Sequence, residues 1–233
     1  VVELLNEFDA SYNFIGNDGP VFWFQTDRDA PRGRVIAIDT RAPARDKWKE
    51  IIPQTAETLL GAGVLNDMFV ATYLKDAKTQ VRIFSLAGSH VRDVELPGIG
   101  SAGGFDGKRK ETETFYSFGG FTTPTSIYRY DMATGRSTLF RRPVVDFNPD
   151  NYETKQVFYT SKDGTKVPMF VTHRKGIRLE KVGLDARAFM VIFEDQSGRY
   201  ELKLDEISDG ERALVALYAI LRLATGQASA IFL

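Results

Sequence analysis

An aromatic run recurs three times in the first 142 residues at almost constant spacing. The runs are VFWFQTDRD, MFVATYLKD and TFYSFGG, and their anchors Phe22, Phe69 and Phe115 lie 47 and 46 positions apart. Each run is followed by a second alternating strand (RVIAIDT, TQVRIFSL, SIYRYDM) and then by a third (WKEIIP, HVRDVELP, STLFRRP). A period of about 40–50 residues with about four short strands per unit is typical of β-propeller blades. The repeat therefore predicts a partial β-propeller.

The number of repeats indicates that this propeller is incomplete. We expect three blades, which begin near Tyr12, Leu59 and Ile99. Three blades are too few to close a ring, and an open ring leaves strand edges unprotected. The sequence also begins with Val1 rather than Met and stops in the apolar run ASAIFL, which is typical of a buried parallel strand. We therefore expect both ends to be truncated and further blades to exist upstream.

Composition excludes several classes of protein. The 233 residues are 43% hydrophobic, which is enough for a buried core. Thirty basic and 31 acidic residues leave a formal charge of −1, so no global field favours nucleic acid or an anionic membrane. The chain has no cysteine, hence no disulfide or thiolate metal site, and no signal-peptide pattern, which favours the cytoplasm.

The pattern changes after Pro143. Two alternating strands in TKQVFYTSKDGTKVPMFVTHRKG are joined through Asp163-Gly164, a dipeptide suited to a tight hairpin turn. From about Lys181 the sequence predicts a second hairpin around Ser197-Gly198, a helix over 209–224 and an apolar strand over 230–233. The predicted fold is therefore mainly β, with propeller blades over 1–150, an exit hairpin over 151–180 and a small α/β fragment over 181–233.

Residues 1–180 resemble one family in several motifs in the same order. NYETKQVFYTSKDGTKVPMFVTHRKGI at 151–177 resembles the passage of prolyl oligopeptidases in which the chain leaves the seven-bladed propeller for the peptidase domain. FDASYNFIGNDGPVFWFQTDRDAPRGRVIAIDT, KWKEIIPQ and ETFYSFGGFTTPTSIYRYDMATG resemble the last blades of that family. The resemblance implies a serine endopeptidase that cuts after proline in short peptides, with the propeller as a lid that admits only small substrates.

The catalytic groups of that family are not expected in this chain. The resemblance implies that the catalytic Ser, Asp and His lie in the peptidase domain, beyond the hairpin. The sequence has no Gly-x-Ser-x-Gly turn. For His90, in a blade strand, we favour an exposed or edge position, and for His173, at the end of a hairpin strand, a structural or solvated role. We therefore assign no catalytic residue and expect no activity from this chain alone.

The stretch ISDGERALVALYAIL begins with a capping box. Ser208 and Glu211 have the spacing that satisfies two free helix N–H groups, and Gly210 lets a ligand approach the backbone. Many such boxes only cap a helix, and that interpretation stays open. A helix N-terminus also suits a phosphate. The stretch resembles the signature motif of ABC-type ATPases, especially the SMC and RecF-like branch, which implies that Ser208 and Gly210, supported by Glu211, contact a nucleotide held by a partner subunit.

The remaining parts of an ATPase site are missing from the sequence. No P-loop occurs, because GGFDGKRKE around Gly107-Lys108 has the wrong glycine spacing, and ASAIFL stops before Walker B acids. We expect no cofactor for the chain alone, and ATP with Mg²⁺ only if a complementary ATPase subunit completes the site. The basic cluster at 107–111 is interpreted as a solvated turn, and acidic pairs such as Glu194-Asp195 give no metal-site pattern.

Three hypotheses follow from the sequence. The first is a non-catalytic propeller fragment of a prolyl oligopeptidase, joined near residue 180 to an ATPase fragment, whose partners are the missing blades and the peptidase domain. The second is a nucleotide-binding half-site. The third is an interaction scaffold whose exposed blade edges recruit another strand or cause oligomerisation.

Overall fold

The computed structural model describes residues 2–176, 178–185, 188–195, 198–203 and 230–232. The chain divides into two compact units, Val1–Gly119 with Thr125–Pro143, and Gly120–Pro124 with Val144–Leu233. Each unit is considered separately. Among the described residues, no helix has the length and apolar character needed to cross a bilayer.

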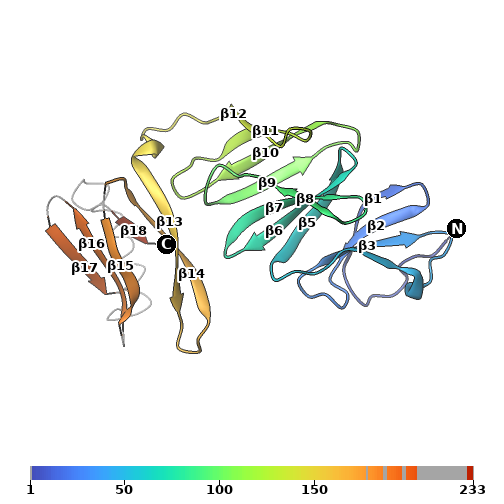
Figure 1. The fold of residues 1–233 in the computed structure, drawn as a ribbon, viewed down its shortest axis with the longest axis horizontal. Coiled ribbons are helices and arrows are strands. Elements are labelled where there is room, and N and C mark those ends of the chain that lie inside the picture. Colours follow the sequence, from blue (N-terminus) through green and yellow to red (C-terminus); the bar gives the residue numbers. More distant parts are fainter. Residues whose placement is uncertain (1, 177, 186–187, 196–197, 204–229, 233) are drawn as a thin grey trace. The chain divides into compact units, whose positions relative to one another are not determined.

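The first unit consists of three four-stranded antiparallel sheets, each with its strands in sequence order (Figure 1). The first sheet comprises β1 (Tyr12–Asp18), β2 (Val21–Thr26), β3 (Arg34–Asp39) and β4 (Lys49–Ile52), with a short 3₁₀ helix η1 (Arg45–Lys47) before β4. The second comprises β5 (Thr58–Leu65), β6 (Met68–Lys75), β7 (Lys78–Ser85) and β8 (His90–Asp93). The third comprises β9 (Ser101–Asp106), β10 (Glu113–Gly119), β11 (Ser126–Asp131) and β12 (Ser137–Arg141). The mainly β fold and the three blades predicted from the repeat are confirmed.

A β-bulge recurs at the same place in each blade. The register between the first and second strands shifts at Ile15, at Leu60 and at Phe105, which each face no partner residue. A bulge bends the strand and increases its local twist. The repeat of this irregularity shows that the three sheets share one pattern, which includes the pairing of their first two strands.

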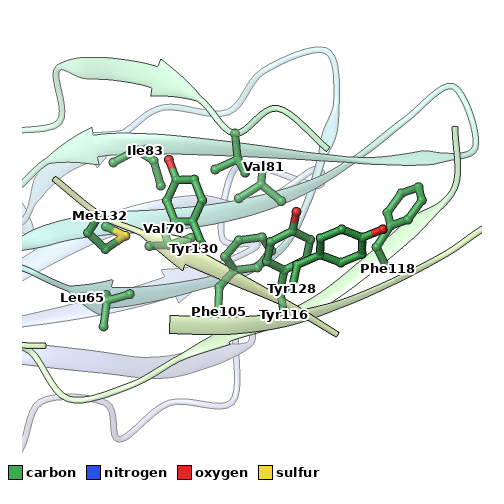
Figure 2. Close-up of a cluster of buried hydrophobic side chains, with 11 residues drawn as sticks. Leu65, Val70, Val81, Ile83, Phe105, Tyr116, Phe118, Tyr128, Tyr130 and Met132 are labelled. Carbon is green, nitrogen blue, oxygen red and sulfur yellow. The ribbon is translucent and has the colours of Figure 1, made fainter. Parts of the chain in front are cut away.

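Alternate residues of the central strands form the cores between blades. Trp23 of β2 packs edge-to-face on Phe69 of β6, with 5.2 Å between ring centroids, in the cluster shared by the first and second blades. The cluster between the second and third blades contains a stack of aromatic rings (Figure 2), in which Tyr116 lies 4.5 Å from Phe105 and 5.3 Å from Tyr128. These rings are almost fully removed from solvent, so the blades are held together chiefly by apolar burial between sheets.

The second unit begins with a 3₁₀ turn η2 (Pro149–Asn151) and a long hairpin, β13 (Tyr152–Thr160) and β14 (Lys166–Arg174). The turn between these strands contains Gly164 at φ +86°, which a residue with a Cβ adopts only with strain. This confirms the hairpin predicted at Asp163-Gly164. The loop 120–124 belongs to this unit, because Phe121 packs on Phe170 of β14 with 5.3 Å between ring centroids.

The C-terminal strands differ from the prediction in two respects. β16 (Ala188–Asp195) and β17 (Gly198–Lys203) form the expected hairpin, but β15 (Arg178–Asp185), which was not predicted, pairs with β16. β18 (Ala230–Phe232) is a strand as expected, yet it pairs antiparallel with β14, so the prediction of a parallel strand is wrong. An apolar run shows that a strand is buried but does not show which neighbour it pairs with. The helix predicted over 209–224 lies outside the described residues.

Candidate functional site

The turns that join the first two strands of each blade are linked by one arginine. Arg109 lies in the loop between β9 and β10, in the third blade. Its Nε donates to Oδ1 of Asp67, in the β5–β6 turn of the second blade, at 2.6 Å. Its Nη1 donates to the carbonyl of Asn17 at 2.9 Å and to Oδ1 of Asp18 at 3.1 Å, at the end of β1 in the first blade. Arg109 therefore contacts all three blades.

Further contacts fix this arginine. Its Cζ lies 5.6 Å from the ring centroid of Trp23, within cation–π range. The backbone N–H of Asp67 donates to the carbonyl of Arg109 at 3.2 Å, and Lys110 Nζ lies 2.7 Å from Asp67 Oδ2. We call Arg109, Asp67, Asp18 and Trp23 the Arg109 clamp. A planar guanidinium with several donors suits such a junction better than an ammonium group, which acts as a point charge.

The charged groups of the Arg109 clamp stabilise one another in their ionised forms. Hydrogen bonds from Lys110 and Arg109 lower the pKa of Asp67 below its ordinary value. Asp67 and Asp18 raise the pKa of Arg109. Both charges are thus present at neutral pH and satisfy one another, so the clamp has a structural role and offers no free acid or base for catalysis.

Sequence reasoning missed the Arg109 clamp. The basic cluster at 107–111 was interpreted as a solvated turn, and the backbone does turn there, but Arg109 is partly buried. Its partners are 42 and 91 positions away along the chain. No local pattern reveals contacts over such separations.

Two adjoining cavities in the first blade share Arg28 and Asp29 and have volumes of about 530 and 270 Å³. Their lining arginines are already paired: Arg28 and Arg45 both bind Asp9, and Arg34 lies 3.1 Å from Glu50. Neither cavity is lined by Ser or His. Neither cavity therefore holds the serine and histidine of a serine-peptidase triad.

Among the described residues, the polar contacts of the two histidines are made to carboxylates and to a backbone carbonyl. His90 is exposed in edge strand β8, and its Nε2 lies 2.8 Å from Asp93 Oδ1, as expected for an edge position. His173 is buried in β14, with Nδ1 2.9 Å from the carbonyl of Arg174 and Nε2 3.6 Å from Glu153 Oε1. Of the two roles left open for His173, its burial supports the structural one. Within the described ranges no group of His, Asp or Glu residues is arranged to hold a metal ion.

Ser208, Gly210 and Glu211, the predicted nucleotide contacts, lie outside the described residues.

Comparison with known proteins decides the family of the blades. The family model of the prolyl oligopeptidase N-terminal beta-propeller domain matches residues 1–143. The chain belongs to the prolyl oligopeptidase propeller family. This confirms the family predicted from the motifs of the first 180 residues. The predicted ATPase resemblance of residues 181–233 gains no support from that match.

Similar proteins of this propeller family are much longer than the present chain. The prolyl endopeptidase of Elizabethkingia meningoseptica is 40% identical over 180 residues, which cover 76% of this chain and 25% of that protein. The dual function macrocyclase-peptidase POPB of Galerina marginata is 33% identical over 184 residues, with 76% and 25% covered. The matched part of the chain thus spans about a quarter of the length of these relatives.

Solved structures of the prolyl oligopeptidase family have the same fold. A prolyl endopeptidase structure superposes with a TM-score of 0.66 at 42% identity, over 75% of this chain and 26% of that one. The apo form of prolyl oligopeptidase B from Galerina marginata gives 0.69 at 32% identity, over 77% and 26%. The chain therefore corresponds to a propeller part of such proteins.

Proposed function

We propose that this chain is a non-catalytic part of the propeller lid of a serine endopeptidase that cuts after proline in short peptides. The observation that carries the proposal is the wall of three blades, joined by shared apolar cores and by the Arg109 clamp. Relatives of about three times this length are named as prolyl endopeptidases. In this proposal the partners of the chain are the remaining blades and a peptidase domain.

The physical basis of a lid is resistance to opening. Close-packed cores between sheets do not deform continuously, because small displacements leave gaps or overlaps. The Arg109 clamp adds polar contacts that link the β9–β10 loop to the β5–β6 turn and to the end of β1. A wall of this kind excludes large peptides by size, and weakening the clamp is expected to relax that exclusion.

A chimera tests this proposal. Residues 1–143 replace the matching segment of the Elizabethkingia meningoseptica prolyl endopeptidase, and kcat/KM is measured for a short proline-containing peptide and for one several times longer. Arg109→Ala is compared with Lys108→Ala, because Lys108 is exposed and it binds Glu111 through its backbone N–H and carbonyl rather than through its side chain. We expect Arg109→Ala to raise kcat/KM for the long peptide relative to the short one, and Lys108→Ala to leave the ratio unchanged. An Arg109→Ala chimera with the parental ratio contradicts the gating role.

The absence of catalysis is tested on the chain itself. We expect no hydrolysis of proline-containing chromogenic peptides and no labelling by serine-directed phosphonates. Labelling of any residue would contradict the proposal.

A second proposal concerns residues 181–233. The capping box at Ser208 and Glu211, next to Gly210, supports a nucleotide half-site that needs ATP, Mg²⁺ and a complementary ATPase subunit. The family model ends at residue 143, and the relatives named above cover 76% of the chain. This pattern supports a composite chain with a join near residue 180.

The half-site has a specific variant. Ser208→Asp preserves a good helix cap but places a negative charge where the phosphate is proposed to bind. With excess ATP-γ-S and Mg²⁺, amides 207–212 are expected to gain protection from hydrogen exchange in the parent chain, alone or with a partner ATPase, and not in Ser208→Asp. Equal protection of amides 207–212 in the two chains would contradict nucleotide binding and leave only the helix-capping role for Ser208.

A further inference from the structure

The outermost strands of the three blades differ in how they are protected. β4, β8 and β12 each end a sheet, so one side of each strand has no neighbouring strand in its sheet. Unpaired edges can add a strand from another chain, and proteins usually block them with charge, short length or bulges. All three pair with their neighbours through a register irregularity, so that feature does not distinguish them.

The edges of the first two blades carry both signs of charge. β4 has the sequence KEII, with Lys49 and Glu50 exposed, and β8 has the sequence HVRD. Both strands are four residues long. A short edge with mixed charges repels part of any charged strand that approaches it.

β12 has a different character. Its sequence is STLFR, and Leu139 and Phe140 are 49% and 64% exposed. Phe140 packs on Phe115 with 4.9 Å between ring centroids, which leaves an apolar surface beside the edge. The strand contains no acidic residue, and in the described ranges β11 is the only strand with which it pairs.

Three arginines surround this apolar segment. Arg136 precedes β12, Arg141 ends it and Arg142 follows it, and all three are exposed. No acidic group in the described part of the chain forms an ion pair with any of them, whereas nearby Arg129 is held by Glu113 at 2.9 Å. The edge thus has apolar side chains at its centre and unneutralised positive charge at both ends.

We propose that β12 is a docking edge for an extended, acidic segment of a partner protein, which adds as a fifth strand. Main-chain hydrogen bonds supply the affinity of strand addition, and side chains set its specificity. The partner segment carries apolar residues opposite Leu139 and Phe140, and acidic residues toward Arg136 at one end and Arg141 and Arg142 at the other. Arg136 and Arg141 are five positions apart, about 17 Å along a strand, which sets the distance between the acidic residues.

This inference does not depend on the peptidase proposal. The outer edge of a blade is distinct from its faces, on which neighbouring blades pack. It therefore concerns a surface outside the blade interfaces and outside the Arg109 clamp.

The test uses a fluorescent peptide with an acidic residue at each end and alternating Val and Thr between them. Binding to the chain is followed by anisotropy, and the site is located by hydrogen exchange. A second peptide of the same sequence has alternate backbone amides N-methylated, so that it keeps its charge but cannot complete a strand ladder. We expect the first peptide to protect amides 137–141, and the N-methylated peptide to bind about tenfold more weakly, a difference of about 1.4 kcal/mol.

Charge reversal supplies matched variants. R141E combined with R142E is expected to weaken binding by about tenfold or more, since it removes attraction and adds repulsion. Lys49→Glu, on the edge of the first blade, is expected to leave binding unchanged. Leu139→Lys tests the apolar centre, and an unaltered unfolding midpoint shows that the blade remains folded.

Several outcomes overturn the inference. Equal affinity of both peptides shows simple charge attraction rather than strand addition. Protection of β4, β8 or the second unit in place of 137–141 places the contact elsewhere. Self-association of the chain that protects amides 137–141 in place of the peptide assigns the edge to a second copy of the chain. No anisotropy change up to about 1 mM peptide, the weak end of specific binding, also overturns it.

Discussion

The propeller blades and the β13–β14 hairpin are both antiparallel β-structure, but they are stabilised in different ways. In the blades, alternate residues of the inner strands are fully buried between two sheets. Over residues 144–176, by contrast, only Val171 and His173 are buried, although each hairpin strand is nine residues long. Strand length therefore says little about stability, because a strand gains most from the sheet packed against its face.

Truncation of an aromatic ring should give the largest difference between these regions. Phe69 is fully buried against Trp23, so Phe69→Ala is expected to lower the free energy of unfolding by about 3–5 kcal/mol. Phe158 in β13 is 48% exposed, and Phe158→Ala is expected to cost less than about 1.5 kcal/mol. Urea denaturation followed by tryptophan fluorescence and by circular dichroism measures both. Similar losses for the two variants would show that the hairpin is as well packed as the blades.

The Arg109 clamp is the next most important difference, since in the described part of the chain the hairpin has no side chain that links three sheets. Arg109→Ala is expected to destabilise the blades by about 1 kcal/mol, because partly exposed ion pairs and cation–π contacts contribute modestly. Lys108→Ala serves as the matched control and should have no effect. The rates of hydrogen exchange at the end of β1, in the β5–β6 turn and in the β9–β10 loop should increase together in Arg109→Ala. Faster hydrogen exchange in only one of these segments would show that the clamp does not couple the blades.

A buried tyrosine in the second blade should make the stability of the blades depend on pH in the alkaline range. Burial raises the pKa of Tyr73 to about 12, and its hydroxyl has no hydrogen-bond partner among the described residues. The unfolded chain ionises this group near pH 10, so its contribution to stability is complete below about pH 10 and is lost as pH rises through about 12. Tyr73→Phe removes this loss and is expected to be neutral, or stabilising by less than about 1 kcal/mol, at pH 7. Identical alkaline unfolding of the two chains would show that Tyr73 is not responsible.

The smallest expected effect is an acid transition confined to the hairpin turn. The Ser161 hydroxyl and the Thr165 N–H donate to Asp163 and lower its pKa to about 2. The stabilisation is present above the ordinary value of 3.8 and is lost as pH falls through about 2. Between about pH 4 and pH 2 the amide of Thr165 should lose protection, after correction for intrinsic exchange, and Asp163→Asn should remove this pH dependence. Asp39 in the first blade also has a pKa lowered to about 2, and Asp39→Asn, which removes that carboxyl group, should leave the pH dependence at Thr165 intact.

Local patterns were sufficient to predict most of the fold. The spacing of Phe22, Phe69 and Phe115 located the blades, and Asp163-Gly164 located the long hairpin, because strand alternation and turn geometry depend on neighbouring residues. β15 escaped prediction, and β18 was placed in the wrong kind of pairing, since neither its partner nor its direction is encoded within the strand.

The sequence by itself determined the period, the number of blades and their likeness to prolyl oligopeptidase propellers, because these features depend on residue type at fixed spacing. Only the tertiary structure decided that Arg109 reaches two other blades and that His173 is buried. It also decided that β12, among the outer strands of the blades, presents an apolar edge between arginines that have no ion-pair partner in the described residues. These properties depend on which distant residues the fold brings together, and on which charges it leaves without a partner.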